Sequence, residues 1–276
     1  MGWRGTLALE YRRRDEQTLA HDRHEGPLRV LRSLYPEGPG VCHSVLVHPP
    51  GGIVGGDVLE VEVALGPGAH ALLTTPGATR FYRSAGEPAE QSIGVRSAAG
   101  TRLEWLPLET IAYSGCLAQN RMRFDLEPEA EMIGWDVTAL GLPSSDLPFA
   151  AGMFTQAIEL PGRWIERGVV RADDRRLLDS PLGWAGHRVL GVAWFAAGRA
   201  LDVARRDALL AAARSAARDS ALAPTSGATS PQPDVVVLRV LAPAVEPAMA
   251  LLRDVWSAWR RLAWDLEPCP PRVWRT

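Results

Sequence analysis

The stretch VLEVEVALGPGAHALL, residues 58–73, carries the pattern that decides the fold. Apolar and polar side chains alternate through its first part, and a period of two is typical of a strand with one buried face. Gly66-Pro67-Gly68 then favours a tight turn, and a second apolar segment follows. The stretch therefore predicts two strands joined by a short turn. The buried face of the first strand comprises Leu59, Val61, Val63 and Leu65, opposite Glu60 and Glu62.

The same order of turn and strand returns twice downstream. LGPGAHALL begins at Leu65, SAAGTRLEW at Ser97 and LEPEAEMIGW at Leu126, so successive units start 32 and 29 residues apart. Units at such spacing indicate stacked β-layers, either a β-helix or a folded-over sandwich. An antiparallel β protein with regular turns is the alternative. The residue pairs that share a face in the three units are Ala71 and Leu73, Leu103 and Trp105, and Met132 and Gly134.

The composition and the pattern of apolar residues change after residue 199. Residues 200–221 are rich in alanine and have leucines at helical spacing, which predicts a helix. Residues 222–234 have the composition of a loop or a disordered segment. Residues 235–242, VVVLRVLA, predict a short buried strand.

A second helix is predicted over residues 245–264, where Pro247 can occupy the first turn. Its apolar stripe comprises Leu251, Val255, Trp259 and Leu262. The whole chain is therefore expected to be mainly β and to form a single unit over 1–276. A β-helix-like body of about residues 1–199 would carry a smaller α/β portion with two helices, about residues 200–276.

Composition and charge exclude several classes of protein. The 276 residues are 46% hydrophobic and 22% charged, which is ordinary for a globular protein. A net charge of -2 gives no electrostatic reason to expect nucleic acid or an anionic membrane surface as a partner. The longest apolar tract, residues 182–198, is short and contains His187-Arg188, so it predicts a buried strand and not a membrane span. Three cysteines without CxxC spacing and no signal peptide favour a reducing cytoplasm.

A glycine-rich motif, HPPGGIVGGDVL, occupies residues 48–59. A phosphate-binding loop would need a lysine and a following helix, whereas here a strand follows and the chain contains no lysine. We interpret the glycines as structural, because they allow backbones to approach closely or to adopt positive φ. Asp57 is the chemical group that the motif presents, either capping the turn or facing a cavity. The four glycines are Gly51, Gly52, Gly55 and Gly56.

Metal ligands and nucleophiles are sparse. Cys42, His43 and His48 lie within seven residues. Strand alternation puts His43 opposite the other two, and Cys42 and His48 would be about 20 Å apart along the strand. They are therefore weak candidates for one metal site. No G-x-S-x-G motif is present and nothing local activates the thiol of Cys116, so we expect no enzyme activity.

Four carboxylates lie in or beside apolar strands: Glu104, Glu109, Asp136 and Glu166. On an alternating strand such residues face water by default. Asp136 and Glu166 each have a tryptophan close in sequence, and an acid buried among aromatic rings has a perturbed pKa and is a functional candidate. The sequence does not decide which face each acid takes.

Taken together, several long motifs resemble the urease accessory protein UreD family, called UreH in some bacteria. They span nearly the whole chain in order. The motifs are RHEGPLRVLRSLYPEG from Arg23, CHSVLVHPPGGIVGGDVLEV from Cys42, GAHALLTTPGATRFYRS from Gly68, LEWLPLETI from Leu103, SPLGWAGHRVLG from Ser180 and CPPRVWRT from Cys269.

The resemblance implies a non-catalytic chaperone of urease maturation. Such a protein binds apo-urease and the accessory protein UreF, and through UreF the GTPase UreG, and it assists nickel delivery; it is compatible with a dimer of such heterocomplexes. No tightly bound cofactor is expected, only transient Ni²⁺. A β-helix-like stack of strands with two helices is the implied fold, with an internal tunnel lined partly by carboxylates. The alternatives are an interaction scaffold that does not handle nickel and an enzyme that uses Asp57 with a second acid.

The resemblance also assigns residues. Asp57 is the acid of the GGxxGGD stretch and Asp136 is the acid that follows Gly-Trp; with Glu166 and Glu109 they are the expected acids of nickel transit. Leu108 departs from the pattern, because a glutamine is expected beside Glu109. Isolated oxygen ligands bind a cation weakly and let it move on, whereas a tight His/Cys cluster would hold it.

Overall fold

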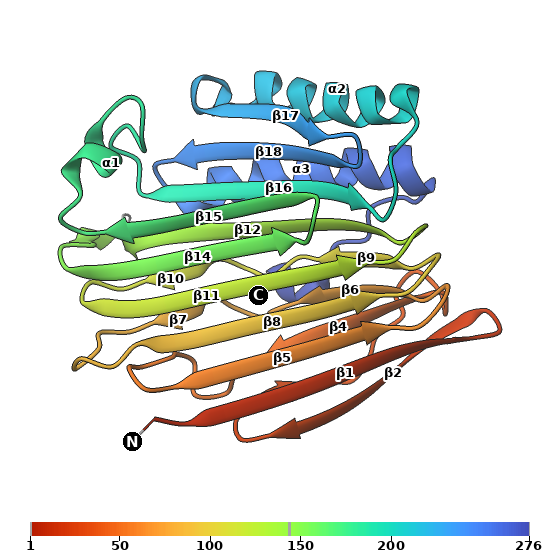
Figure 1. Ribbon diagram of the computed structural model, residues 1–276, viewed down its shortest axis with the longest axis horizontal. Coiled ribbons are helices and arrows are strands. Elements are labelled where there is room, and N and C mark those ends of the chain that lie inside the picture. Colours follow the sequence, from red (N-terminus) through yellow and green to blue (C-terminus); the bar gives the residue numbers. More distant parts are fainter. Residues whose placement is uncertain (1, 143–144, 276) are drawn as a thin grey trace.

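The computed structural model describes residues 2–142 and 145–275. Within them two β-sheets and two long helices form three layers (Figure 1). We call the seven-stranded sheet the outer sheet. Its strands, in spatial order, are β15 (Trp164–Arg171), β14 (Gly152–Leu160), β11 (Cys116–Leu126), β8 (Ala89–Ser97), β5 (Val58–Leu65), β1 (Arg4–Arg14) and β2 (Gln17–Glu25).

The central sheet has eleven described strands and lies between the outer sheet and the helices. Three short strands lie off its main path: β10 and β13 pair with β12, and β7 pairs with β10. Its main path, in spatial order, is β17 (Ser226–Gln232), β18 (Val235–Ala242), β16 (Val189–Ala197), β12 (Glu131–Leu142), β9 (Arg102–Trp105), β6 (His70–Thr74), β4 (Val41–Val47) and β3 (Arg29–Val30); the short strands are β7 (Thr79–Phe81), β10 (Thr110–Ala112) and β13 (Leu147–Pro148).

The chain alternates between the two sheets, which confirms the β-helix-like expectation. β5, β8 and β11 stack in parallel in the outer sheet, and β6, β9 and β12 stack in parallel in the central sheet. The repeat predicted from sequence is reproduced residue by residue. In the central sheet Ala71 pairs with Leu103 and Leu103 with Met132, while Leu73 pairs with Trp105 and Trp105 with Gly134.

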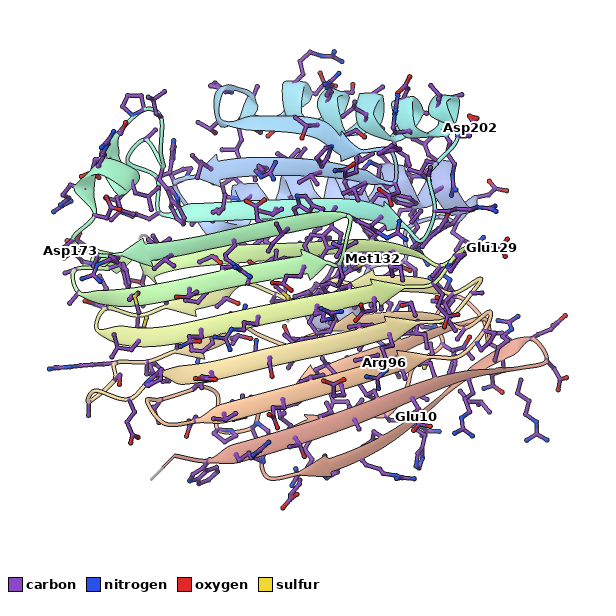
Figure 2. All side chains as sticks on the ribbon, viewed as in Figure 1. Glu10, Arg96, Glu129, Met132, Asp173 and Asp202 are labelled. Atoms are coloured by element: carbon purple, nitrogen blue, oxygen red, sulfur yellow. The ribbon has the colours of Figure 1, made fainter. Side chains whose placement is uncertain are left out.

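Both faces of the central sheet are buried, and strand alternation divides its side chains between two cores. Along β12, Met132 and Leu140 face the outer sheet, whereas Ile133 and Trp135 face the helices. The expectation that acids on these strands face water is therefore wrong for Glu104, which is 0% exposed, and for Asp136, which is 6% exposed. Charged side chains lie instead on the far face of the outer sheet, among them Glu10 and Arg96 (Figure 2).

The two predicted helices are confirmed as α2 (Val203–Asp219) and α3 (Val245–Trp264), which lie beside β16, β17 and β18 (Figure 1). The prediction that Leu262 belongs to the buried stripe is wrong, because this residue is 50% exposed. A row at i, i+4 that runs through Val255 and Trp259 continues at Ala263, which packs against the core next to the helices. No described helix has both the length and the apolar character needed to cross a membrane.

The prediction of a loop over residues 222–234 is wrong. A short 3₁₀ turn at Ala223–Thr225 leads into β17, which pairs with β18. Ala228 is buried opposite Leu238. Pairing with a strongly apolar strand therefore outweighs the loop-like composition.

The prediction of one buried strand over residues 182–198 is wrong in its first part. Helix α1 (Arg175–Asp179) and a turn precede β16, which begins only at Val189. Leu182 in that turn is 99% exposed. Gly186, at a φ of +83°, adopts the left-handed conformation that keeps this segment out of the sheet.

Candidate functional site

A cavity of about 260 Å³ lies between the outer and central sheets. Its walls include Leu59, Ile93 and Met122 from the outer sheet and Trp105 and Asp136 from the central sheet. It reaches the surface, because its lining also includes the exposed residues Pro76 and Gly77, which precede β7, and Arg80 on β7. His48, Gly51 and Gly52 belong to the same lining.

A polar row, buried at Asn120 and partly buried at its two neighbours, crosses the outer sheet beside this cavity. Gln91, Asn120 and Gln156 occupy adjacent positions on β8, β11 and β14. The Gln91 amide donates to the Asn120 side-chain oxygen at 3.1 Å. Neither the amide nitrogen nor the amide oxygen of Gln156 has a hydrogen-bond partner among the described residues. The interior of the sandwich is therefore not uniformly apolar.

Asp136 is the carboxylate that faces the cavity. It follows Gly134 on the inward side of β12, and its Oδ2 accepts a hydrogen bond from the Thr138 hydroxyl at 3.2 Å. Burial raises the pKa of Asp136 to about 6, and the nearby Thr138 hydroxyl and Gln156 amide oppose part of that rise. The group is thus ionised near neutral pH but protonates in mild acid.

Hydroxyl groups surround this acid on the central sheet. Thr79, Thr110 and Thr138 are paired in register across β7, β10 and β12, and the first two line the cavity. Carboxylate, amide and hydroxyl oxygens together form a set of hard donors, suited to weak contact with a divalent cation. His48 adds one imidazole to the lining. Burial lowers the pKa of His48, so its ring is mostly neutral and can donate a nitrogen lone pair.

Asp57 lies outside the cavity lining and is 9% exposed. Its Oδ1 accepts the backbone N–H of Trp3 at 2.8 Å, and its Oδ2 accepts that of Val54 at 3.0 Å. Of the two readings that the sequence left open for this residue, the geometry corresponds to the capped turn.

The four glycines of the motif have two kinds of environment. Gly51 and Gly56 have φ values of +76° and +92°, where side chains are strained. A Cβ on Gly52 would lie 2.0 Å from the Tyr82 ring, and one on Gly55 would lie 2.3 Å from a hydroxyl oxygen. The motif therefore needs glycine for two reasons: close contact with neighbouring groups at Gly52 and Gly55, and positive φ at Gly51 and Gly56.

The remaining acids of the predicted set lie elsewhere. Glu166 on β15 pairs with Arg239 on β18, with Nε 3.0 Å from Oε2, and so links the two sheets at their far edge. Glu109 lies near Arg253 of α3, where its charge partly offsets the lowering of the Arg253 pKa by burial. Neither acid lines the cavity.

Cys42 and His43 are neighbours on β4, but their side chains have different surroundings. Cys42 packs in the core between the sheets, while the His43 Nε2 lies 2.6 Å from Glu37. In residues 2–142 and 145–275 no three His, Cys, Asp or Glu side chains are grouped so that they could hold a metal ion. Of the predicted site residues, the structure brings only Asp136 and His48 to the cavity, together with Gly51 and Gly52.

A second buried polar group was not predicted; of its members only Glu104 was singled out from the sequence, as an acid expected to face water by default. Glu104 Oε1 lies 2.8 Å from His70 Nε2, and its Oε2 lies 3.3 Å from Arg260 Nε. The same Oε2 accepts the Trp256 indole N–H at 2.6 Å, and Arg260 reaches Glu37 at 2.5 Å. We call these five residues the α3 charge cluster. Arg260 lies one turn from Trp256 on the buried side of α3. This spacing between an arginine and an apolar residue was the available sequence signal for the cluster.

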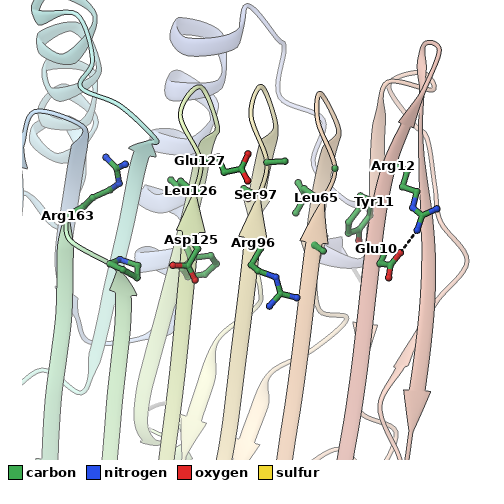
Figure 3. A pocket seen from close by; sticks show the side chains of 15 residues that line it. Glu10, Tyr11, Arg12, Leu65, Arg96, Ser97, Asp125, Leu126, Glu127 and Arg163 are labelled. Carbon is green, nitrogen blue, oxygen red and sulfur yellow. Dashed lines mark hydrogen bonds and ion pairs between the residues drawn. The ribbon is translucent and has the colours of Figure 1, made fainter.

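A second, open hollow has a different character. It measures about 540 Å³ and lies where β1, β5, β8 and β11 end (Figure 3). Two arginines in its lining already pair with acids. Arg12 pairs with Glu10 at 2.8 Å, and Arg163 pairs with Asp234. The smaller cavity, with its unpaired acid, is therefore the candidate site.

Stability should report on the buried charge of Asp136. Its folded-state pKa of about 6 exceeds its ordinary value of 3.8, so the folded chain loses stability as the pH rises through this range. Asp136→Asn should therefore raise the free energy of unfolding at pH 7 by about 1 to 3 kcal/mol. The gain should vanish near about pH 3, where both residues are neutral. Urea titrations at the two pH values measure this; equal stability at pH 7 would contradict a buried, ionised Asp136.

Comparisons with known proteins find the same family over nearly the full length of the chain. A model of the family described as UreD urease accessory protein matches residues 4–275. A protein of Leptothrix cholodnii named urease accessory protein UreD is 60% identical over 278 residues, covering 100% of both chains. Proteins of the same name from Paracidovorax citrulli and Polaromonas naphthalenivorans are 59% and 58% identical, with 99% of each chain covered. The similarity therefore includes both sheets, both long helices and the cavity.

Proposed function

The chain belongs to the UreD urease accessory protein family, and from this premise we propose that it is a non-catalytic chaperone of urease maturation that gives nickel ions a passage through the cavity between its two sheets. The proposal has two parts. The first is a role in urease maturation, which the family name carries. The second is passage of the ion through this subunit, which rests on the cavity and on Asp136.

The observation that carries the second part is the uncompensated charge of Asp136. In the described residues no arginine or histidine forms an ion pair with it, whereas Glu104 and Glu166 each have an arginine partner. A buried ionised carboxylate without a partner is costly. A passing divalent cation would supply the missing positive charge.

The other donors of the cavity favour transit over storage. One carboxylate, one imidazole, side-chain amides and hydroxyls lie along the cavity wall. Single donors of this kind bind an ion weakly, and weak binding at successive positions lets the ion leave again. Nickel is the cargo in this account and not a resident cofactor.

Partners follow from the family resemblance. We propose that the chain binds the urease apoprotein and UreF, and that UreG joins through UreF, so that the cavity connects a nickel donor with the enzyme that receives it. A pure interaction scaffold is the second candidate. It is favoured by Asp57, whose two carboxylate oxygens are both engaged by backbone amides.

Co-expression tests the role in maturation. Urease, UreF and UreG are produced with and without this chain at the same nickel concentration, and the nickel content of the purified urease is measured. We expect near-stoichiometric nickel only when the chain is present. Equal nickel content in both preparations would contradict the proposed function. Variants of the cavity acid Asp136 distinguish passage of nickel through the chain from a scaffolding role.

A further inference from the structure

The mouth of the cavity is built from two chain segments that follow neighbouring strands of the central sheet. Residues 75–80 lead from β6 into β7, and residues 107–110 lead from β9 into β10. Both contribute to the cavity lining, and we call them the mouth segments. They lie side by side, because the Leu108 N–H donates to the Thr75 hydroxyl at 2.9 Å. The exposed lining residues of the first segment are Pro76, Gly77 and Arg80.

One buried hydroxyl joins the two mouth segments at the points where they begin. Thr74 is the last residue of β6 and is 1% exposed. Its hydroxyl donates to the carbonyl of Leu106, the residue that follows β9, at 2.7 Å. Because this hydroxyl has a single hydrogen, its oxygen can only accept from a further partner. The indole N–H of Trp274 takes that place at 2.8 Å, so a residue 200 positions away in the chain completes the junction.

Trp274 is itself held by side chains of α3 and β12. It lies in a 3₁₀ turn over Arg272–Arg275. Its ring centroid lies 5.3 Å from that of Trp135 and 5.7 Å from that of Trp256. The Arg253 guanidinium lies 5.0 Å from the centroid of the Trp274 ring. A segment that belongs to neither a strand nor a long helix is ordered only when contacts of this kind fix it.

The same group of side chains reaches the second mouth segment directly. The Trp135 indole N–H donates to the Pro107 carbonyl at 2.6 Å. The negative charge of Glu109 acts on the guanidinium of Arg253, which is partly buried. Trp274 packs against both Trp135 and Arg253 but does not belong to the cavity lining. It therefore acts on the mouth through its neighbours and not by touching an ion.

We propose that Trp274 is a positioning residue for the mouth of the cavity: its hydrogen bond to Thr74 and its packing against Trp135 hold the two mouth segments in the shape that admits nickel. The inference rests on the proposed function and deepens it, because it assigns control of access to the cavity to the segment after α3. Short segments that line a binding site have low local stability, so their shape depends on such support.

Hydrogen exchange followed by mass spectrometry tests this support in the full chain. Trp274→Ala removes both the indole N–H and the stacked ring, so amides of the mouth segments should exchange about tenfold faster or more. Thr74→Val removes the hydroxyl while keeping the branched shape, and it should act in the same direction. The double variant should fall short of the product of the two single effects, because both substitutions break the same hydrogen bond.

Trp264→Ala is the matched control. Trp264 is another tryptophan beside the central sheet whose indole N–H is bonded, in this case to Glu131 at 2.8 Å. Its ring contacts are with His70 and Phe195, and it lies outside the cavity lining. Amides of β16 report the change in global stability of each variant. Relative to them, exchange of the mouth segments in Trp264→Ala should change less than about twofold.

Nickel delivery distinguishes failure of this inference from failure of the proposed function. Trp274→Ala should bind urease and UreF like wild type and deliver about threefold less nickel, or lower still. Trp274→Phe keeps the stacked ring and loses only the N–H, so it should recover part of the delivery. It also carries the exchange test if alanine at this position unfolds the chain.

Three results would overturn the inference: wild-type exchange of the mouth segments in Trp274→Ala, faster exchange with wild-type nickel delivery, or loss of binding to urease or UreF. In each case the proposed function stands as long as the wild-type chain promotes nickel delivery. A wild-type chain that leaves the nickel content of urease unchanged would remove the proposed function and this inference together.

Discussion

Asp136→Asn is expected to reduce nickel delivery to urease by about tenfold or more, while the protein stays folded and bound to its partners. The substitution keeps the shape of the side chain and removes the one carboxylate that residues 2–142 and 145–275 contribute to the cavity lining. An amide oxygen is a weaker ligand for a divalent cation than a carboxylate. Nickel content and activity of urease matured with UreF and UreG measure the effect.

Glu166→Gln is the matched control for this prediction. It also neutralises one acid, but the Glu166 carboxylate pairs with Arg239 and lies outside the cavity lining. Nickel delivery should change less than about twofold, because this carboxylate lies outside the cavity lining and a partly exposed ion pair contributes little to stability. Wild-type delivery by Asp136→Asn would contradict passage through the cavity. Loss of complex formation in this variant would show that Asp136 acts in folding or assembly.

Arg260→Leu is expected to lower the free energy of unfolding by about 3 to 5 kcal/mol. Arg260 is 0% exposed and contacts both Glu37 and Glu104, so its removal leaves the buried Glu104 and the partly buried Glu37 without their shared cation. The hydrogen bond with His70 and the positive charge of Arg260 hold the pKa of Glu104 below its usual value despite burial. The melting temperature should fall by roughly 6 to 20 °C.

The α3 charge cluster also joins elements far apart in sequence. Glu37 precedes β4, Glu104 lies on β9 and Arg260 lies on α3. Arg239→Leu is the control, because Arg239 pairs with Glu166 at a partly exposed position and its loss should cost no more than about 1 kcal/mol. Thermal unfolding followed by circular dichroism compares the two. Equal losses would contradict the view that the cluster fixes α3 on the central sheet.

Much of the fold was predictable because its repeats are periodic. The spacing of LGPGAHALL, SAAGTRLEW and LEPEAEMIGW aligned Ala71 with Leu103 and Met132, as the central sheet does. Helix α3 began and ended at the predicted residues. Strands and helices of this kind follow from local alternation and helical spacing, so they can be predicted without knowledge of distant contacts.

The layer that each acid faces could not be predicted in the same way. Asp136 and Glu104 both lie on the central sheet, yet Asp136 faces the outer sheet and Glu104 faces α3. Alternation distinguishes two faces but does not say which one is covered, and here both are. Residues 222–234 show a related limit, because β17 forms through pairing with β18.

The cavity itself depends on register between strands far apart in sequence. Gln91 and Asn120 meet because β8 and β11 align, and Asp136 reaches the same space from the other sheet. None of these residues belongs to a motif with a characteristic spacing. The neighbouring Trp135 and the resemblance to a known family both marked Asp136 as a candidate, but neither showed that it faces a cavity.

The central claim is that nickel occupies the cavity beside Asp136. Crystals soaked in nickel and measured at the nickel absorption edge test it most directly. We expect an anomalous peak within coordination distance of an Asp136 carboxylate oxygen, and no such peak in crystals of Asp136→Asn. Anomalous density confined to the outside of the protein, with none between the two sheets, would contradict the account.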